Sequence, residues 1–294
     1  MTNEIIIAGE EQPIVPREAD TDAQLIDLWL HGRSRHTQRA YRADVERFLR
    51  LVGKPLMEVR LADIQAFADA LDGGDLEPAS RHRILSSLKS LFAFGHRIGY
   101  LAFDTARPLK LPGLRDQLSE RILDEGQIQR IIALETNPRN SIMLRLLYAA
   151  GVRVSELCGL RWRDCQGRDD NDGQISVFGK GDKTRVVLLP SSVFQQLIEL
   201  RQDASDVQPV FLSRRKRHLH PSQVLRIVRA AAKRAGIEKA VSPHWFRHAH
   251  ASHALDRGAP ISLVQSTLGH SQIATTGRYL HARPSDSSSR YLPL

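Results

Sequence analysis

The segment over 107–115 does most to limit what this chain can fold into. It reads Arg-Pro-Leu-Lys-Leu-Pro-Gly-Leu-Arg, with two prolines, a glycine and no helical spacing of its apolar residues. Proline cannot continue a helix, and it pushes the residue before it towards an extended conformation. We therefore predict an interdomain linker over 106–120. A length of 294 residues is ample for a folded domain on each side of that linker.

The part before the linker is predicted to be a small helical domain over 21–105, behind a flexible leader over 1–20. The leader contains two prolines and shows no periodicity. In the domain, apolar residues recur three and four positions apart, which is typical of helices that bury one face. The four expected helices cover 22–31, 35–51, 61–71 and 80–98.

The charge of the chain points to a polyanionic partner. The net charge is +9, and since residues 1–20 contribute −4, the rest of the chain carries +13. A folded body this basic most often binds nucleic acid, although composition alone leaves open a basic protein that binds none. The side chains expected to contact DNA are Arg39, Arg42, Arg81, Arg83 and Lys89 in the first domain, with Lys183 and Arg185 in the second.

The second domain is expected over 121–283 and combines helices with one hairpin. Two runs rich in β-branched residues, 174–178 and 184–189, flank a turn with two glycines, which is a hairpin signal. The predicted fold class is therefore mainly α with a small β-sheet (α+β). The expected helices cover about 125–135, 139–150, 154–162, 191–203, 221–236, 243–257, 261–268 and 271–281.

A C-terminal tail is expected over 284–294. It begins with a polar stretch and ends with Tyr-Leu-Pro-Leu. Apolar residues after a polar spacer favour burial on a neighbouring protomer, and a frayed end is the alternative.

Six residues of the second domain suit chemistry on a phosphodiester. The planar guanidinium of arginine matches phosphate oxygens two at a time and stabilises added negative charge. Tyrosine, with a pKa of about 10, becomes a useful nucleophile when cations stabilise its phenolate. Taken singly, each residue also has an ordinary explanation, such as a helix cap, a solvated turn or a packed aromatic. The six candidate catalytic residues are Arg153, Lys180, His244, Arg247, His270 and Tyr279.

Local sequence suggests how some of these residues are presented. Ser242 followed by proline is typical of a helix start with a capping serine. His244 and Arg247 then lie on one face near a helix N-terminus, where free N–H groups favour an anion. Glu156 is close enough in sequence to orient Arg153. A carboxylate that only complements the helix dipole is the equal alternative.

Other functional classes find little support. Four histidines crowd positions 244–253, but no His-Glu-x-x-His spacing occurs, so we expect no metal. The Gly-Lys-Gly at 179–181 lacks the rest of a phosphate-binding Walker loop, and we expect no cofactor. Cys158 and Cys165 are expected to be thiols in a reducing cytosol. Without a membrane-length apolar run or a secretory signal, we expect a cytoplasmic, nucleoid-associated protein and no membrane partner.

Five motifs together resemble the tyrosine recombinase (phage integrase) family, and the chain's size resembles its Xer type or a compact integrase. The resemblance covers about 21–290 and implies an N-terminal core-binding domain and a catalytic domain that clamp duplex DNA. One departure is the Gly-Arg pair before Tyr279, where the family more often has an apolar or acidic residue. The motifs are Gly-Val-Arg-Val-Ser-Glu-Leu at 151–157, Gly-Lys-Gly-Asp-Lys-Thr-Arg at 179–185, His-Trp-Phe-Arg-His at 244–248, Leu-Gly-His-Ser at 268–271 and Thr-Thr-Gly-Arg-Tyr at 275–279.

The resemblance implies a role for each candidate residue. Arg153 and Arg247 would hold the scissile phosphate, and His270 would bond one of its oxygens. Lys180 would protonate the departing 5′ oxygen, His244 would act in proton transfer, and Tyr279 would form a 3′-phosphotyrosine link. Glu156 matches the family's acidic position behind the site.

The resemblance also implies the partners and the reaction. The partners would be double-stranded DNA and either three further copies, forming a homotetramer on two duplexes, or a related recombinase. The reaction would be site-specific recombination, in chromosome dimer resolution or in integration and excision of a mobile element. A type IB topoisomerase and a catalytically silent DNA-binding protein are the alternatives.

Overall fold

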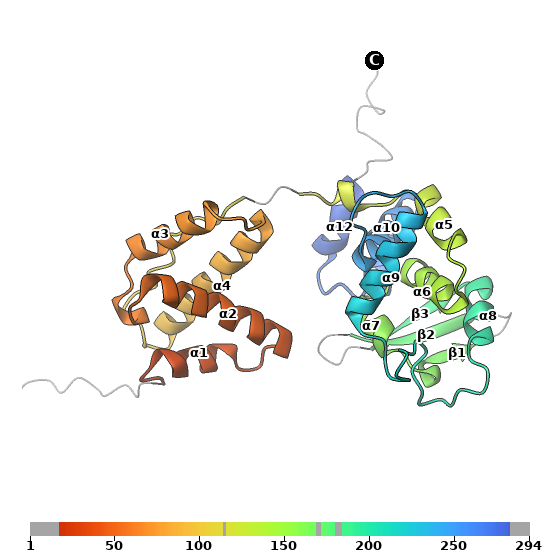
Figure 1. The fold of residues 1–294 in the computed structure, drawn as a ribbon, viewed down its shortest axis with the longest axis horizontal. Helices are drawn as coiled ribbons and strands as arrows, with labels where there is room; N and C mark the ends of the chain where they lie inside the picture. The colour runs from red at the N-terminus through yellow and green to blue at the C-terminus, as the bar shows by residue number, and fades with distance from the viewer. Residues whose placement is uncertain (1–17, 114–115, 169–171, 180–183, 283–294) are drawn as a thin grey trace, which may run out of the picture. The chain divides into compact units, whose positions relative to one another are not determined.

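The computed structural model describes residues 18–113, 116–168, 172–179 and 184–282. The chain divides into two compact units, Met1–Arg115 and Asp116–Leu294, and each is described by itself (Figure 1). The division falls inside the segment predicted to be a linker. The predicted tail, most of the predicted leader, and both Lys180 and Lys183 lie outside the described residues.

The first unit is a small helical bundle with an aromatic centre. Thr21 and Ser34 each cap a helix, because their side chains accept a hydrogen bond from an N–H of the first turn. Phe48 makes edge-to-face contacts with Phe67 and Phe92, with 5.1 and 6.0 Å between ring centroids. The elements are α1 (Asp22–Leu30), α2 (Arg35–Val52), a 3₁₀ turn (Leu56–Glu58), α3 (Leu61–Asp72) and α4 (Pro78–Arg97).

Much of the predicted linker packs onto one unit or the other. Lys89 on α4 donates hydrogen bonds to the carbonyls of Arg107 and Leu109, at 2.8 and 2.6 Å. Leu109 is buried in the core of the first unit. Leu118 and Ile122 are buried in the second unit. Leu109 and Leu118 of this segment therefore belong to the cores of the first and the second unit, respectively.

The second unit is mainly helical with one small sheet, so the predicted fold class is confirmed (Figure 1). Short 3₁₀ turns lie at Ser119–Arg121 and Trp162–Asp164. In the described part of the chain, no helix is both long and apolar enough to cross a membrane. The elements are α5 (Glu125–Ala133), α6 (Pro138–Ala149), α7 (Val154–Gly159), β1 (Cys165–Gly167), β2 (Gly173–Phe178), β3 (Thr184–Leu189), α8 (Ser191–Glu199), α9 (Pro221–Arg234), α10 (Pro243–Asp256), α11 (Ile261–Leu268) and α12 (Ile273–Ala282).

The sheet is antiparallel, with strand order β1-β2-β3. Ile175 and Val177 on β2 pair with Val187 and Arg185 on β3, and the valines and Ile175 are buried. The hairpin predicted from the two β-branched runs is confirmed, and its buried and outward residues alternate as in a half-buried sheet. β1 was not predicted, because three residues are too few to display an alternating pattern.

Two helices end earlier than predicted, and the one expected over 191–203 ends at Glu199. The helix expected over 154–162 ends at Gly159. The backbone of Arg161 and Trp162 pairs instead with Pro209 and Gln208, far along the chain. Tertiary pairing therefore overrides the local helical pattern at this point.

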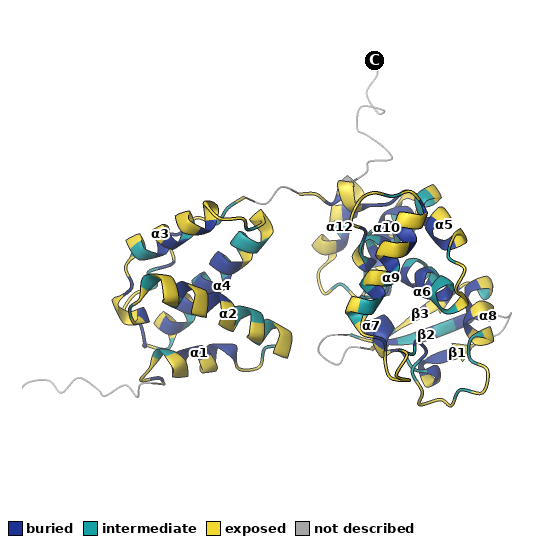
Figure 2. Ribbon diagram, viewed as in Figure 1, coloured by how far each residue is buried: buried dark blue, intermediate teal, exposed yellow. Residues whose placement is uncertain are grey.

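Helix α10 is the central helix of the second unit. It contacts α5, α6, α9, α11 and α12. Phe246, Ala249 and Ala251 are fully buried, as expected for a helix that is covered on most sides (Figure 2). His244 and Arg247 lie near the start of this helix, so the packing of the helix fixes the positions of their backbones.

A small apolar cluster holds α11 and α12 against α10. Because Tyr279 belongs to this cluster, its ring is part of the packed interior. The buried members are Leu118, Ile122, Ala251, Val264, Leu268 and Tyr279.

Paired glycines in the sheet provide a test of this packing. Gly173 on β2 pairs with Gly167 on β1, and a Cβ at Gly173 would overlap the ring of Phe194. We expect Gly173→Ala to lower the free energy of unfolding by about 1–3 kcal/mol, the usual cost of overpacking. Urea unfolding, followed by tryptophan fluorescence, measures this change.

Gly167→Ala is the matched control. A Cβ at Gly167 would stand 3.7 Å from the same Phe194 ring, an ordinary contact. We expect a change within about 0.5 kcal/mol for this variant. Equal effects of the two substitutions would contradict the packing described for Phe194.

Candidate active site

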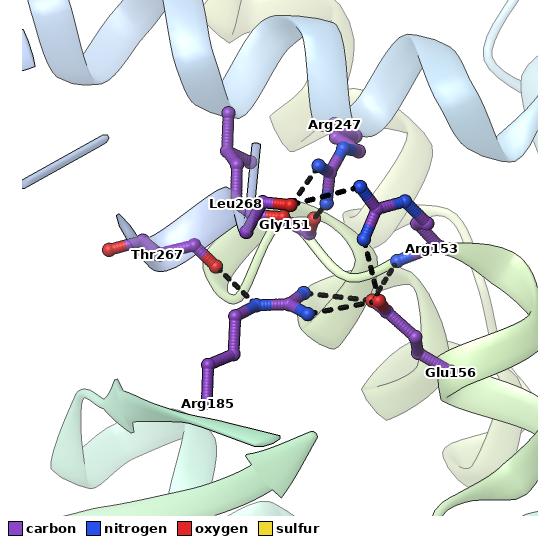
Figure 3. Close-up of polar contacts among 8 residues, drawn as sticks. Gly151, Arg153, Glu156, Arg185, Arg247, Thr267 and Leu268 are labelled. Atoms are coloured by element: carbon purple, nitrogen blue, oxygen red, sulfur yellow. Dashed lines mark hydrogen bonds and ion pairs between the residues drawn. The ribbon is translucent and has the colours of Figure 1, made fainter. Parts of the chain in front are cut away.

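The candidate site lies where α7, α10 and the connection from α11 to α12 meet (Figure 3). Gly151, which leads into α7, has φ +56°, a left-handed conformation that glycine adopts without strain. A Cβ on Gly151 would come within 3 Å of the side chains of Leu268 and His250. Glycine is therefore required here both for the turn and for the close approach of α10 and α11.

Arg247 is buried and tightly held. Its Nη1 donates to the carbonyl of Gly151 at 2.5 Å, and its Nη2 donates to the carbonyl of Leu268 at 2.7 Å (Figure 3). Burial, together with the charge of Arg153, lowers the pKa of Arg247 to about 10. The side chain is still a cation at neutral pH, so the site holds a fixed positive charge.

Glu156 is the carboxylate that joins two arginines. It accepts hydrogen bonds from Nη1 and the backbone N–H of Arg153, at 2.8 and 2.7 Å. It also receives both terminal nitrogens of Arg185, at 2.9 and 2.8 Å. Burial acts to raise the pKa of Glu156, but the hydrogen bonds from Arg185 and Arg153 outweigh it and hold the pKa below its usual value. The carboxylate is thus charged and fully engaged.

The carbonyls at the C-terminal end of α11 receive three different arginines. Arg185 Nε donates to Thr267 at 2.7 Å, and Arg247 donates to Leu268. Arg153 Nη2 donates to the next carbonyl in the chain at 3.2 Å. The C-terminal end of a helix carries partial negative charge, which favours cations. This end of α11 therefore orients all three guanidinium groups.

Arg185 lies in the interior of the site. Arg185 was predicted to contact DNA, but its side chain is only 12% exposed and is held by Glu156 and Thr267 (Figure 3). The side chain of Arg153, in contrast, is 35% exposed. Arg185 therefore supports the site from behind, while part of Arg153 remains open to an incoming ligand.

His270 follows α11 and is fixed by α12. Its Nδ1 lies 2.9 Å from the hydroxyl of Thr276, which is fully buried. Burial, with the charges of Arg247, Arg153 and Arg185, lowers the pKa of His270 to about 4. His270 is therefore neutral at pH 7.

Tyr279 on α12 is almost completely buried, at 5% exposure. Its ring is nearly parallel to that of His270, at 6° and 6.5 Å between centroids. The expectation that nearby cations activate it included Lys180, which lies outside the described residues, so it stays a prediction. Burial raises the pKa of Tyr279, and the opposing charges of Arg247 and Arg278 do not cancel that effect. The phenol is protonated at neutral pH.

Two histidines lie one helical turn apart on α10, and the second of them, His248, contacts Tyr279. His244 and His248 have ring centroids 6.5 Å apart. Part of His244 is exposed, yet burial of the rest, with Arg247 and Arg153, lowers its pKa. His248, which the sequence analysis did not single out, has its Nδ1 2.8 Å from the Tyr279 hydroxyl. The four-residue spacing between the histidines was the available signal.

Helix α10 begins at Pro243 as predicted, but without the expected cap. Ser242 occupies the N-cap position and its side chain makes no capping hydrogen bond. Among the residues that the structure describes, no three His, Cys, Asp or Glu side chains lie close enough together to hold a metal ion.

Most of the basic residues expected to contact DNA in the first unit have protein partners. Arg42 pairs with Asp27 at 2.5 Å, Arg81 with Asp72, and Arg83 with Asp44. Lys89 is bound to backbone carbonyls, as described above. Arg39 is exposed on α2. These contacts leave their proposed role in DNA binding as a prediction.

The sequence matches two known protein families. The Phage integrase family matches residues 121–286, and the "Phage integrase, N-terminal SAM-like domain" matches residues 24–99. A "Tyrosine recombinase" of Thermosipho africanus is 34% identical over 270 residues, which cover 87% of this chain and 92% of that protein. The "Tyrosine recombinase XerD" of Shewanella oneidensis is 35% identical over 279 residues, covering 88% and 91%.

Solved structures share the fold. The XerA recombinase is 28% identical and covers 92% of this chain and 98% of its own, with a TM-score of 0.52. A lambda integrase dimer bound to a COC′ core site reaches a TM-score of 0.71 at 19% identity, covering 91% and 79%. A post-cleavage complex of XerH with a palindromic difH substrate reaches 0.70 at 21%, covering 93% and 85%. The last two indicate a common fold.

The buried carboxylate allows a prediction about stability. Glu156→Gln removes the charge that joins Arg153 and Arg185, and we expect it to lower the free energy of unfolding by about 3–5 kcal/mol at pH 7. Because the pKa of Glu156 is lowered in the folded protein, its contribution is present above its unfolded-state pKa of about 4.3 and is lost as pH falls further. The difference between the two proteins should shrink below that pH.

Urea unfolding at pH 7 and at several lower pH values measures both effects. Glu199→Gln, at the exposed end of α8, is the control, and we expect it to change stability by no more than about 0.5 kcal/mol. A Glu156→Gln variant as stable as the wild type at pH 7 would contradict the role given to this carboxylate.

Proposed function

This chain belongs to the phage integrase family of tyrosine recombinases, and on that premise we propose that it recombines specific sites in duplex DNA through a 3′-phosphotyrosine intermediate. The observation that carries the proposal is the convergence of three elements. α7 brings Arg153, α10 brings Arg247, and α12 brings Tyr279 close enough for the charge of Arg247 to act on its pKa.

The two arginines suit the scissile phosphate. Arg247 is held in one orientation by two carbonyls, and Arg153 by Glu156 and a third carbonyl. A preorganised cation needs little rearrangement when negative charge develops on the phosphate during attack. His270 is neutral and adjacent, which supports a role as a hydrogen-bonding partner of a phosphate oxygen.

The covalent step explains how the reaction conserves energy. Attack by the Tyr279 oxygen on phosphorus exchanges one phosphodiester bond for another and releases a 5′ hydroxyl. The link to the protein stores the energy that rejoining requires, so ATP has no necessary role. We propose that Lys180 supplies the proton to the departing 5′ oxygen and that His244 assists in proton transfer.

The partners are proposed from the relatives. A solved lambda integrase is a tetramer bound to a Holliday junction, and XerH is bound to difH DNA. We propose that this chain acts on two duplexes as a homotetramer or with a related recombinase. The 35% identity to a XerD supports a Xer-type role in chromosome dimer resolution, with integration or excision of a mobile element as the other outcome.

Tyr279→Phe tests the nucleophile. The substitution removes only the attacking oxygen, so we expect DNA binding to persist and the covalent adduct to vanish. A nicked suicide substrate, whose short 5′ fragment diffuses away, should trap the wild-type protein on a 3′ phosphate. Gel shift and peptide mapping of the adduct measure both.

Two results would contradict this assignment. One is an adduct that persists in Tyr279→Phe or maps to Tyr291 or another tyrosine. The other is efficient relaxation of plasmids lacking any specific site without exchange between paired sites, which would favour a topoisomerase.

Lys180→Ala tests the proposed acid. We expect the cleavage rate to fall by about 10²–10⁴ while DNA affinity stays unchanged. In a substrate with sulfur in place of the leaving 5′ oxygen, the sulfur departs without protonation. This substrate should therefore restore the cleavage rate of Lys180→Ala. Failure of this substrate to restore cleavage by the variant would remove Lys180 from the role.

A further inference from the structure

The described residues contain a direct partner for the nucleophile's hydroxyl. His248 Nδ1 lies 2.8 Å from Tyr279 Oη, and the two ring centroids are 5.7 Å apart. His248 is on α10, partly buried, one turn after His244. In the described part of the chain, this hydroxyl makes no hydrogen bond with His244 or His270. The Nδ1 of His270 pairs with the hydroxyl of Thr276 instead.

Both members of the pair are neutral before DNA binds. Burial lowers the pKa of His248 to about 4, and the charges of His244, Arg121, Arg247 and Arg278 act the same way. His248 is therefore neutral and has a lone pair on one ring nitrogen. Tyr279 is a neutral phenol, so its O–H donates to Nδ1 in the tautomer of His248 that carries its proton on Nε2.

We propose that His248 is the general base of strand cleavage, a catalytic residue that takes the proton of the Tyr279 hydroxyl. This inference rests on the proposed function of Tyr279. As Oη bonds to phosphorus, its proton passes to His248 Nδ1. The bond between phosphorus and the 5′ oxygen breaks, and that oxygen takes a proton from the acid, proposed above to be Lys180. In rejoining, the His248 imidazolium returns its proton to the departing phenolate.

Binding of DNA suits this role. Bringing a phosphate between Arg153 and Arg247 adds negative charge near His248 and counteracts the surrounding cations. An added anion raises the pKa of an imidazole. The base is thus unprotonated before DNA binds, and its affinity for a proton increases when the substrate is in place.

The test uses the full-length protein and the nicked suicide substrate. His248→Asn keeps a carbonyl acceptor near the position of Nδ1 but cannot hold a proton at neutral pH. We expect the rate of adduct formation at pH 7 to fall by about 10²–10⁴, with DNA affinity unchanged. Between pH 6.5 and 9 the variant's rate should rise by about tenfold per unit, because hydroxide must replace the base, while the wild-type rate changes little.

Another histidine of α10, His253, bonds to a tyrosine on α6 and provides the matched control. His253 Nδ1 bonds to the Tyr148 hydroxyl at 3.0 Å, with ring centroids 5.8 Å apart. His253→Asn makes the same change away from the site, and we expect adduct formation at the wild-type rate. The substrate with a sulfur leaving group should restore Lys180→Ala and should leave His248→Asn slow, because the missing proton acceptor serves the other oxygen.

The outcomes separate the two proposals. If Tyr279→Phe still forms the adduct, the proposed function fails. If Tyr279→Phe abolishes it but His248→Asn keeps the wild-type rate or pH profile, only the assignment of the base is overturned. Should His248→Asn fold poorly, the rate of adduct formation by His248→Ala is measured in added imidazole instead. Adduct formation that increases with unprotonated imidazole supports the proposal, and a rate that is indifferent to imidazole overturns it.

Discussion

Much of this site depends on how three arginines are held close together. Like charges at such spacing repel one another, so the arrangement needs fixed negative charge. The Glu156 carboxylate supplies one full charge between Arg153 and Arg185. Three successive carbonyls at the C-terminal end of α11 supply the rest, one for each arginine. Because the helix end and the carboxylate are both part of the folded interior, the cations are in position before any phosphate arrives.

The cations in turn determine the protonation of their neighbours. Burial, together with the arginines, keeps His270 and His248 neutral at pH 7. Tyr279 stays a protonated phenol because burial outweighs the attraction of the cations for a phenolate. The free protein thus combines charged phosphate ligands with neutral groups that can exchange protons. This separation of roles follows from which side chains find a carboxylate or carbonyl partner and which do not.

Close packing at one glycine connects these elements. Gly151 has a left-handed backbone, and its carbonyl accepts a hydrogen bond from Arg247. Its missing side chain lets Leu268 and His250 approach within distances that a Cβ would prevent. The turn before α7, the start of α10 and the end of α11 are therefore held together by hydrogen bonds from Arg247 to two backbone carbonyls and by side chains packed on Gly151. Positions of this kind are more accurate than those set by long, flexible side chains.

The sequence by itself determined most of the secondary structure, the fold class and the motifs at the site. Helical spacing in α2, the Ser-Pro start of α10 and the β-branched runs of β2 and β3 are local patterns, and the six candidate catalytic residues together indicated phosphate chemistry. Tertiary structure alone decided that Arg185 faces inward, that His248 reaches the Tyr279 hydroxyl, and that β1 pairs at the sheet edge. It also decided that Tyr279 is buried, which raises its pKa. The physical reason is that burial and hydrogen-bond partners depend on residues far apart in the chain, such as Glu156 and Arg185, whose meeting no local pattern encodes.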